Sequence, residues 1–124
     1  MSRERFSITF MSGPLDGKTM EWTVPSTTKP FVLPIGRAEG SAIHIGYDSQ
    51  VSRIHANVIY AIVDDLFFLE DLGSRNGTHL GQVRIPQNER VPLIIGELFR
   101  IGRTWLRIDP ETVEYEDDFD DIPF

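Results

Sequence analysis

The sequence predicts an all-β domain, and more specifically an antiparallel β-sandwich. Short apolar or alternating runs recur about every eight to twelve residues, and Gly, Pro, Asn and Asp separate them, as is typical of sandwiches and barrels. No stretch shows the periodicity of an amphipathic helix. The length of 124 residues corresponds to one domain, and a 40% share of hydrophobic residues is enough to build its core.

The apolar runs predict the strands in order along the chain. Candidate strands are residues 5–11, 19–24, 31–36, 54–63, 66–71, 98–101 and 104–108. The run 54–63 is apolar on both faces along its later half, which indicates a central strand. Asp64 and Asp65 fit a two-residue hairpin loop before the next strand, and Gly81 with Gln82 fits a second one of type II′.

The charge is distributed unevenly along the chain. Residues 1–109 hold twelve basic and twelve acidic residues, whereas residues 110–124 hold seven acidic residues and no basic one. We therefore expect a folded domain over 1–109 and an acidic, flexible tail over 110–124. A body without excess positive charge argues against nucleic acid as a partner.

The composition also limits the chemistry and the compartment. The chain contains no cysteine, so a disulfide framework, a thiolate metal site and a cysteine nucleophile are impossible. No signal-peptide pattern and no long apolar span is present in the sequence. We expect a cytoplasmic protein without a cofactor, a metal or a membrane partner, and the sequence leaves the oligomeric state open.

Three arginines stand in short polar clusters at the ends of predicted strands. Arg37 follows the strand 31–36, Arg53 lies beside Ser52, and Arg75 precedes Asn76. Loops that connect the strands of a sandwich gather at its two ends, so these distant segments can converge. Arginine, hydroxyl and amide donors on such loops suit a phosphate dianion, because charge-assisted hydrogen bonds are the strong ones.

The order and spacing of these clusters resemble a known signature. Gly36-Arg37, then Ser52-Arg53-Ile54-His55, then Asn76-Gly77-Thr78 are similar to the GR, SxxH and NGT motifs of forkhead-associated (FHA) domains. The resemblance covers about residues 6 to 108. It implies a sandwich of about 10–11 strands that binds phosphothreonine segments of partner proteins in Ser/Thr kinase signalling, without being an enzyme.

The resemblance also implies roles for individual residues. Arg37 is similar to the arginine that bonds the phosphate, and Ser52 to the serine whose hydroxyl and backbone N–H close on the phosphate oxygens. Arg53 and Arg75 are expected to add positive charge there, and Asn76 to hydrogen-bond the main chain of the peptide. Residues expected to support the binding loops are Gly36, His55, Gly77 and Thr78.

Two other functions remain as alternatives. One is an FHA fold that acts through phosphate-independent contacts or self-association. The other is a hydrolase built on Ser52 and His55, with Asp48 or Asp71 orienting the histidine. No G-x-S-x-G motif supports the hydrolase, and His44 and His79 lack the spacing of metal ligands.

Overall fold

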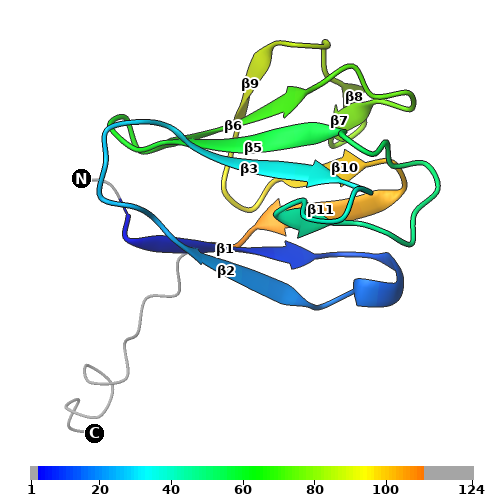
Figure 1. The fold of residues 1–124 in the computed structure, drawn as a ribbon, viewed down its shortest axis with the longest axis horizontal. Helices are drawn as coiled ribbons and strands as arrows, with labels where there is room; N and C mark the ends of the chain where they lie inside the picture. The colour runs from blue at the N-terminus through cyan, green and yellow to red at the C-terminus, as the bar shows by residue number, and fades with distance from the viewer. Residues whose placement is uncertain (1–2, 111–124) are drawn as a thin grey trace, which may run out of the picture.

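Two β-sheets pack face to face in the computed structural model, which describes residues 3–110 (Figure 1). The elements in chain order are β1 (Arg5–Phe10), the 3-10 helix η1 (Gly13–Leu15), β2 (Thr19–Thr23), β3 (Phe31–Gly36), β4 (Ile43–His44), β5 (Ala56–Ala61), β6 (Leu66–Asp71), β7 (Thr78–Leu80), β8 (Val83–Arg84), β9 (Arg90–Leu93), β10 (Leu98–Ile101) and β11 (Thr104–Ile108). Sheet A has the strand order β2-β1-β11-β10-β7-β8, and sheet B has the order β4-β3-β5-β6-β9. The predicted sandwich is confirmed.

Within residues 3–110, every strand pair is antiparallel except one. Strand β4 runs parallel to β3, with Ile35 opposite Ile43, so sheet B is mixed and the purely antiparallel prediction is corrected at this edge. Strand β4 is only two residues long and was not among the strands proposed from the sequence.

The alternation predicted for the strands places one face of each sheet in a shared core. Phe6, Ile8 and Phe10 of β1 face Val58 and Tyr60 of β5, and all five side chains are buried. At one end of the core, the ring of Phe6 packs edge-on against Phe67, with 4.9 Å between ring centroids. Burial of such large apolar side chains provides most of the driving force for folding.

The predicted strand 54–63 is shorter than expected, although it does lie inside its sheet. Strand β5 spans Ala56–Ala61, and its ladder with β6 runs over the same residues. Ile54 and Val63, which the prediction included, lie outside the strand and are 69% and 72% exposed. The loop to β6 therefore contains four residues, 62–65, and not the two predicted, since Ala61 pairs with Leu66. Asp65 takes a φ of 52° in this loop.

The second predicted hairpin is confirmed. Leu80 pairs with Val83, so Gly81 and Gln82 form a two-residue loop. Gly81 has a φ of 54° and Gln82 has no positive φ, which is the φ pattern of a type II′ turn.

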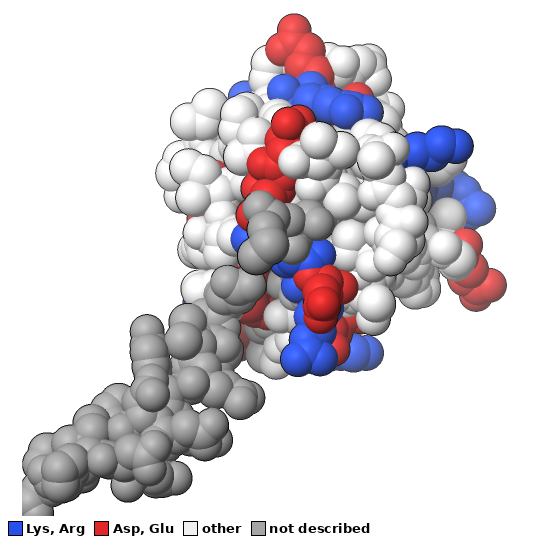
Figure 2. Space-filling view, turned by 90° about the vertical axis from the view of Figure 1, so that its left-hand side faces the viewer, with Lys and Arg blue, Asp and Glu red and all other residues white. Residues whose placement is uncertain are grey.

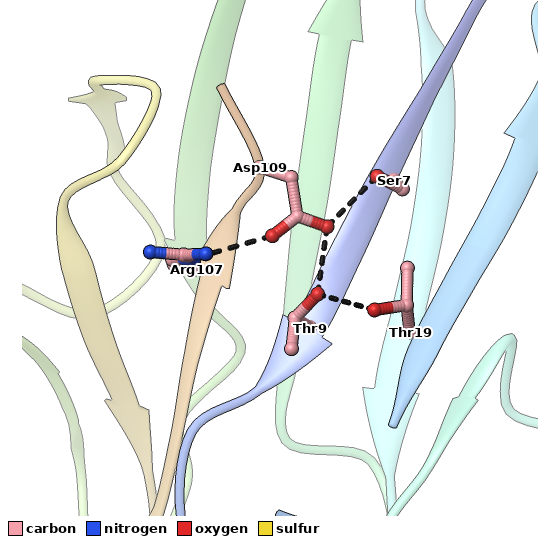
Figure 3. Close-up of polar contacts among 5 residues, drawn as sticks. All are labelled: Ser7, Thr9, Thr19, Arg107 and Asp109. Atoms are coloured by element: carbon pink, nitrogen blue, oxygen red, sulfur yellow. Dashed lines mark hydrogen bonds and ion pairs between the residues drawn. The ribbon is translucent and has the colours of Figure 1, made fainter. Parts of the chain in front are cut away.

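A polar cluster fixes the end of the last strand. The Asp109 carboxylate accepts hydrogen bonds from the hydroxyls of Ser7 and Thr9, at 2.8 and 2.7 Å, and pairs with the Arg107 guanidinium (Figure 3). The Asp109 N–H also donates to the Ser7 carbonyl oxygen. The packed body thus continues through Asp109, whereas the acidic segment predicted for 110–124 lies, apart from Pro110, outside the described residues.

The two ends of the sandwich differ in what they carry. Strand β1 begins and β11 ends at one end, and the loops that follow β3 and β6 and precede β5 lie at the other (Figure 1). Between residues 3 and 110, no helix is both long and apolar enough to cross a membrane. The loops at the second end contain the predicted binding residues.

Candidate functional site

Three loops meet at Ser52. The N–H of Arg37 donates to the Ser52 carbonyl oxygen at 3.0 Å, and the N–H of Arg75 donates to the Ser52 hydroxyl oxygen at 3.1 Å. The next residue along the first loop repeats the pattern, since the Ala38 N–H donates to the Arg53 carbonyl oxygen. The structure therefore brings together the three clusters that the sequence singles out, although 15 to 38 positions separate the first from the others.

Close approach of two backbones explains the glycine before Arg37. A Cβ atom at Gly36 would lie 2.1 Å from the carbonyl oxygen of Arg53. Any side chain here would separate the end of β3 from the loop that precedes β5. The glycine at position 36 is thus required by the close approach of the two backbones and not by an unusual φ.

His55 connects two of the three loops. Its side chain is fully buried, its Nδ1 accepts the Ser52 N–H at 2.9 Å, and its Nε2 lies 3.0 Å from the Gly77 carbonyl oxygen. Because Nδ1 accepts, Nε2 carries the proton and donates to Gly77, so the ring is neutral. Burial lowers the pKa of His55, and the Gly77 hydrogen bond offsets this only in part. The supporting role of His55 in the binding loops stays a prediction.

The hydrogen bond to His55 also limits which groups of Ser52 remain available to a ligand. The resemblance implied that both the hydroxyl and the backbone N–H of Ser52 face the phosphate. The structure commits the N–H to His55, so the hydroxyl is the group left to bind a ligand. The Arg75 N–H donates to the hydroxyl oxygen and thereby orients it.

The alternative hydrolase is not built by this geometry. A serine nucleophile needs its hydroxyl hydrogen-bonded to the imidazole that removes its proton. Both ring nitrogens of His55 are instead engaged by backbone groups, of Ser52 and of Gly77. The carboxylates of Asp48 and Asp71, imagined as the orienting acid, bind loop donors instead of the histidine ring.

Asp71 holds the loop 72–77 in place, and sequence reasoning did not assign it this role. Its buried carboxylate accepts the N–H groups of Gly73 and Ser74 at 3.0 and 3.1 Å and the hydroxyl of Thr78 at 2.6 Å. The Ser74 hydroxyl also donates to it and in turn accepts the Gly77 N–H. Burial alone would raise the pKa of Asp71, but these hydrogen bonds outweigh burial and lower it, so the carboxylate is ionised.

Asp48 performs a similar task for the loop between β4 and β5. Its Oδ1 accepts the Gln50 N–H at 2.9 Å, while its Oδ2 accepts the Arg103 N–H and the Thr104 hydroxyl, both at 2.8 Å. The β10–β11 hairpin is thereby joined to the loop that carries Ser52. Arg103 is a fourth arginine at this end, and only the long-range fold brings it there.

Asn76 and Gly77 close the third loop. The Asn76 side chain is exposed, and its Nδ2 donates to the Gln50 carbonyl oxygen at 3.0 Å, which leaves Oδ1 as an acceptor for a ligand. Gly77 takes a φ of 85°, which a residue with a side chain rarely adopts. Thr78 is fully buried, and its hydroxyl donates to the Asp71 carboxylate.

The arginines of the site form no ion pair with a carboxylate of residues 3–110. Arg37, Arg53 and Arg75 are exposed, and the Arg37 Nε donates to the Val51 carbonyl oxygen at 3.0 Å. Arg37 and Arg53 line a depression together with Glu39, His44 and Gly46.

The ion pairs of the molecule lie elsewhere. Over residues 3–110, ion pairs join only Arg3 to Asp65 and Arg107 to Asp109. At the end of the sandwich that carries the termini, basic and acidic side chains are intermixed (Figure 2). In the same described part of the chain, no three His, Asp or Glu side chains gather closely enough to hold a metal ion.

The structure is a β-sandwich whose loops at one end carry exposed arginines. Comparison with known proteins shows the family to which this fold belongs. The FHA domain family matches residues 33–102, so the chain belongs to the FHA family. It is 37% identical over 76 residues to the FHA domain-containing protein FhaB of Mycobacterium tuberculosis, a match that covers 61% of this chain and 46% of FhaB. The aligned region thus spans about half the length of that curated relative.

Solved structures show the same fold. The N-terminal FHA domain of S. cerevisiae Rad53p, in complex with a phosphothreonine peptide, superposes with a TM-score of 0.74 and 20% identity over 92% of this chain and 95% of that one. Mycobacterium tuberculosis EmbR, in complex with a low-affinity phosphopeptide, superposes with a TM-score of 0.68 and 21% identity over 86% of this chain and 24% of that one.

Proposed function

We propose that this FHA domain binds phosphothreonine-containing segments of partner proteins in Ser/Thr kinase signalling and has no catalytic role. The observation that carries the proposal is the convergence of Arg37, the Ser52 hydroxyl and Arg75 on loops that buried groups hold in place. A phosphate dianion needs such donors, and each charge-assisted hydrogen bond contributes about 1.5 to 3 kcal/mol. The phosphopeptides bound by Rad53p and EmbR support the same function.

Each candidate residue has a task in this proposal. Arg37 and the Ser52 hydroxyl bind the phosphate oxygens, and Arg53 and Arg75 add positive charge around them. Asn76 binds the peptide main chain through its free Oδ1, because its amide nitrogen is engaged by Gln50. Gly36, His55, Gly77 and Thr78 support the loops. The cytoplasmic location expected from the sequence stays a prediction.

A binding assay with Arg37→Ala tests the proposal. The parent protein is titrated with a degenerate phosphothreonine library and with phosphoserine and unphosphorylated versions of it. We expect binding only to phosphorylated peptides, with phosphothreonine preferred. Arg37→Ala should weaken this binding by about 1.5 to 3 kcal/mol, roughly ten- to a hundredfold.

The matched control is Arg5→Ala, which removes an exposed arginine from the start of β1, at the end of the sandwich opposite the loops (Figure 1). It should bind as the parent does. Both variants should melt within a few degrees of the parent, because neither side chain is buried. Equal binding by the parent and Arg37→Ala would refute the assignment of the pocket.

A second candidate function is self-association through the outer face of sheet B. Four apolar residues occupy one rung across this face: Val32, Ile59, Phe68 and Pro92, of which Ile59 is only 1% exposed. Beside them an apolar groove between β6 and β9 is lined in part by Leu66 and Ile94, which are 53% and 67% exposed. Two copies can pair such a face about a two-fold axis. Sedimentation of the parent and Phe68→Asp tests this, since a parent that stays monomeric at high concentration eliminates the candidate.

A further inference from the structure

A row of basic and aromatic side chains crosses the outer face of sheet A. Arg100 pairs with Trp105 on one side and with His79 on the other, and His79 pairs with Arg84. The row points away from the core, because the alternating neighbours Phe99 and Leu106 are fully buried. We call Arg84, His79 and Arg100, with Trp105 behind them, the basic row.

The basic row starts at the third binding loop. A Cβ atom at Gly77 would lie 2.6 Å from the Arg84 Nε and 2.9 Å from its Cζ. The Arg84 guanidinium therefore rests on the backbone of the residue that follows Asn76. The Ile85 N–H donates to the Thr78 carbonyl oxygen at 2.9 Å and holds this strand pair in place.

The far side of the row is held rigidly. The Arg100 Nη1 donates to the Gly102 carbonyl oxygen at 2.7 Å, and the guanidinium carbon lies 5.5 Å from the centroid of the Trp105 ring. A cation held over an aromatic face keeps its charge and loses little side-chain freedom when it binds an anion.

No carboxylate of the described chain neutralises this row. Neither Arg84 nor Arg100 belongs to an ion pair formed within residues 3–110. The Asp71 carboxylate acts to raise the pKa of His79, and its oxygens are engaged by the loop donors. The Nδ1 of His79 is buried and has no hydrogen-bond partner among the described residues. Burial, and then the guanidinium groups of Arg100 and Arg84, lower the pKa of His79, so the ring is neutral and the arginines supply the charge.

We propose that the basic row is a subsite for acidic side chains of the bound phosphothreonine segment, on the side of the phosphorylated residue that passes Asn76 and Gly77. This inference rests on the proposed function, because Asn76 has to hold the peptide main chain beside Arg84. A carboxylate one or more residues from the phosphothreonine then meets Arg84 first and Arg100 further along the row. The domain accordingly prefers phosphothreonine followed, in that direction, by Asp or Glu.

The test compares three peptides with the same phosphothreonine in an uncharged host sequence. One has a short run of Asp on the N-terminal side of the phosphothreonine, one has it on the C-terminal side, and one has none. At low ionic strength the parent should bind one acidic peptide about three- to fivefold more tightly than the neutral peptide. The gain should shrink at high salt, where exposed charges are screened.

Two variants at one position separate charge from packing. Arg84→Gln should remove the gain and leave the affinity for the neutral peptide unchanged, whereas Arg84→Lys should retain most of the gain. Arg5→Gln, the matched loss of an exposed arginine at the end of the sandwich opposite the binding loops, should retain all of it.

The possible outcomes distinguish a failure of the proposed acidic subsite from a failure of the proposed phosphothreonine binding. Equal binding of all three peptides, or a gain that persists in Arg84→Gln, overturns the subsite and leaves phosphothreonine binding intact. Failure of all three peptides to bind, or binding that does not depend on the phosphate, overturns the proposed function itself.

Discussion

The side chain of His55 and the backbone of Ser52 are joined by a hydrogen bond of 2.9 Å, in which the Ser52 N–H donates to the imidazole Nδ1. Because the other ring nitrogen bonds the Gly77 carbonyl oxygen, one neutral histidine sets the distance between two binding loops. We therefore expect His55 to contribute to binding indirectly, so that its loss is detected first in the stability of the fold.

His55→Ala should lower the free energy of unfolding by about 2 to 4 kcal/mol, because it leaves a cavity and two backbone groups without partners. Urea unfolding at pH 7 measures this. His44→Ala is the matched control, since His44 is exposed, and it should cost well under 1 kcal/mol. A His55→Ala protein of normal stability that no longer binds phosphopeptide would make His55 a direct ligand.

The lowered pKa of His55 predicts a pH dependence. The folded state keeps the ring neutral, while the unfolded chain takes up a proton near the ordinary value of 6.5. The parent should therefore lose stability as the pH falls below about 6.5, whereas His55→Ala should lose less over the same interval. Parallel stability profiles for the two proteins between pH 7.5 and 5 would contradict the neutral ring.

The lowered pKa of Asp71 predicts a second loss of stability, at a lower pH than the one expected for His55. Its folded pKa lies below the ordinary value of 3.8, so its stabilising effect is complete above that value and disappears as the pH falls through the folded pKa. Asp71→Asn should cost about 2 to 4 kcal/mol at pH 7, because an amide replaces an ionised acceptor of buried donors. The difference from the parent should shrink at strongly acidic pH, and urea midpoints at pH 7 and pH 3 would show it. If Asp71→Asn destabilises the protein equally at pH 7 and at pH 3, then the ionised carboxylate of Asp71 is not what stabilises the loop 72–77.

Gly36 and Gly40 offer a matched pair that separates close approach from backbone strain. Gly36→Ala places a methyl group 2.1 Å from the Arg53 carbonyl oxygen, whereas at Gly40, with a φ of 88°, nothing lies within 4 Å of the added Cβ. We expect Gly36→Ala to cost about 2 to 4 kcal/mol and to impair phosphopeptide binding, because the first two loops must move apart. Gly40→Ala should cost about 1 kcal/mol and leave binding unchanged. Thermal melts combined with one titration of each variant measure both effects, and equal costs would contradict the close approach as the cause.

Local patterns in the sequence predicted the parts of the fold that local chemistry determines. Alternation located the long strands, and Gly81 with Gln82 located a hairpin. The same pattern extended β5 too far, because Ile54 and Val63 are apolar residues that the fold leaves exposed. Whether an apolar side chain is buried depends on which other parts of the fold cover it, and the local sequence pattern does not show this.

The candidate site shows more clearly that local sequence patterns do not predict long-range contacts. The sequence grouped Arg37, Ser52 and Arg75 because they follow or precede predicted strands and because the order and spacing of their motifs resemble those of a known family. It could not assign the roles of Asp48 and Asp71, because an isolated Asp in a loop is indistinguishable from a solvated surface charge. The bond from Asp48 to the Arg103 N–H joins residues 55 positions apart, and only the folded chain shows that both carboxylates are buried.

The last prediction concerns the acidic segment that begins after Pro110. Seven carboxylates tethered to a domain with exposed arginines are present at a high effective concentration and can compete with phosphopeptides. Asp109 is fixed against β1 at the end opposite the loops, so reach decides which residues can compete (Figure 1). At about 3.3 Å per extended residue, Thr112 extends only about 10 Å beyond Asp109, whereas Asp120 and Asp121 extend about 36 to 40 Å.

Truncation after Pro110 should therefore tighten phosphopeptide binding at low salt, with a smaller gain at high salt, where exposed charges are screened. A full-length variant with Asp120 and Asp121 changed to Asn is the sharper comparison, because it removes only the charges that can reach the loops. It should recover much of the gain, whereas Glu111→Gln, at the start of the segment, should recover none. Titration of the four proteins with one phosphothreonine peptide at two salt concentrations measures this. Identical affinities of the truncated and full-length proteins at low ionic strength would show that the segment does not compete for the site.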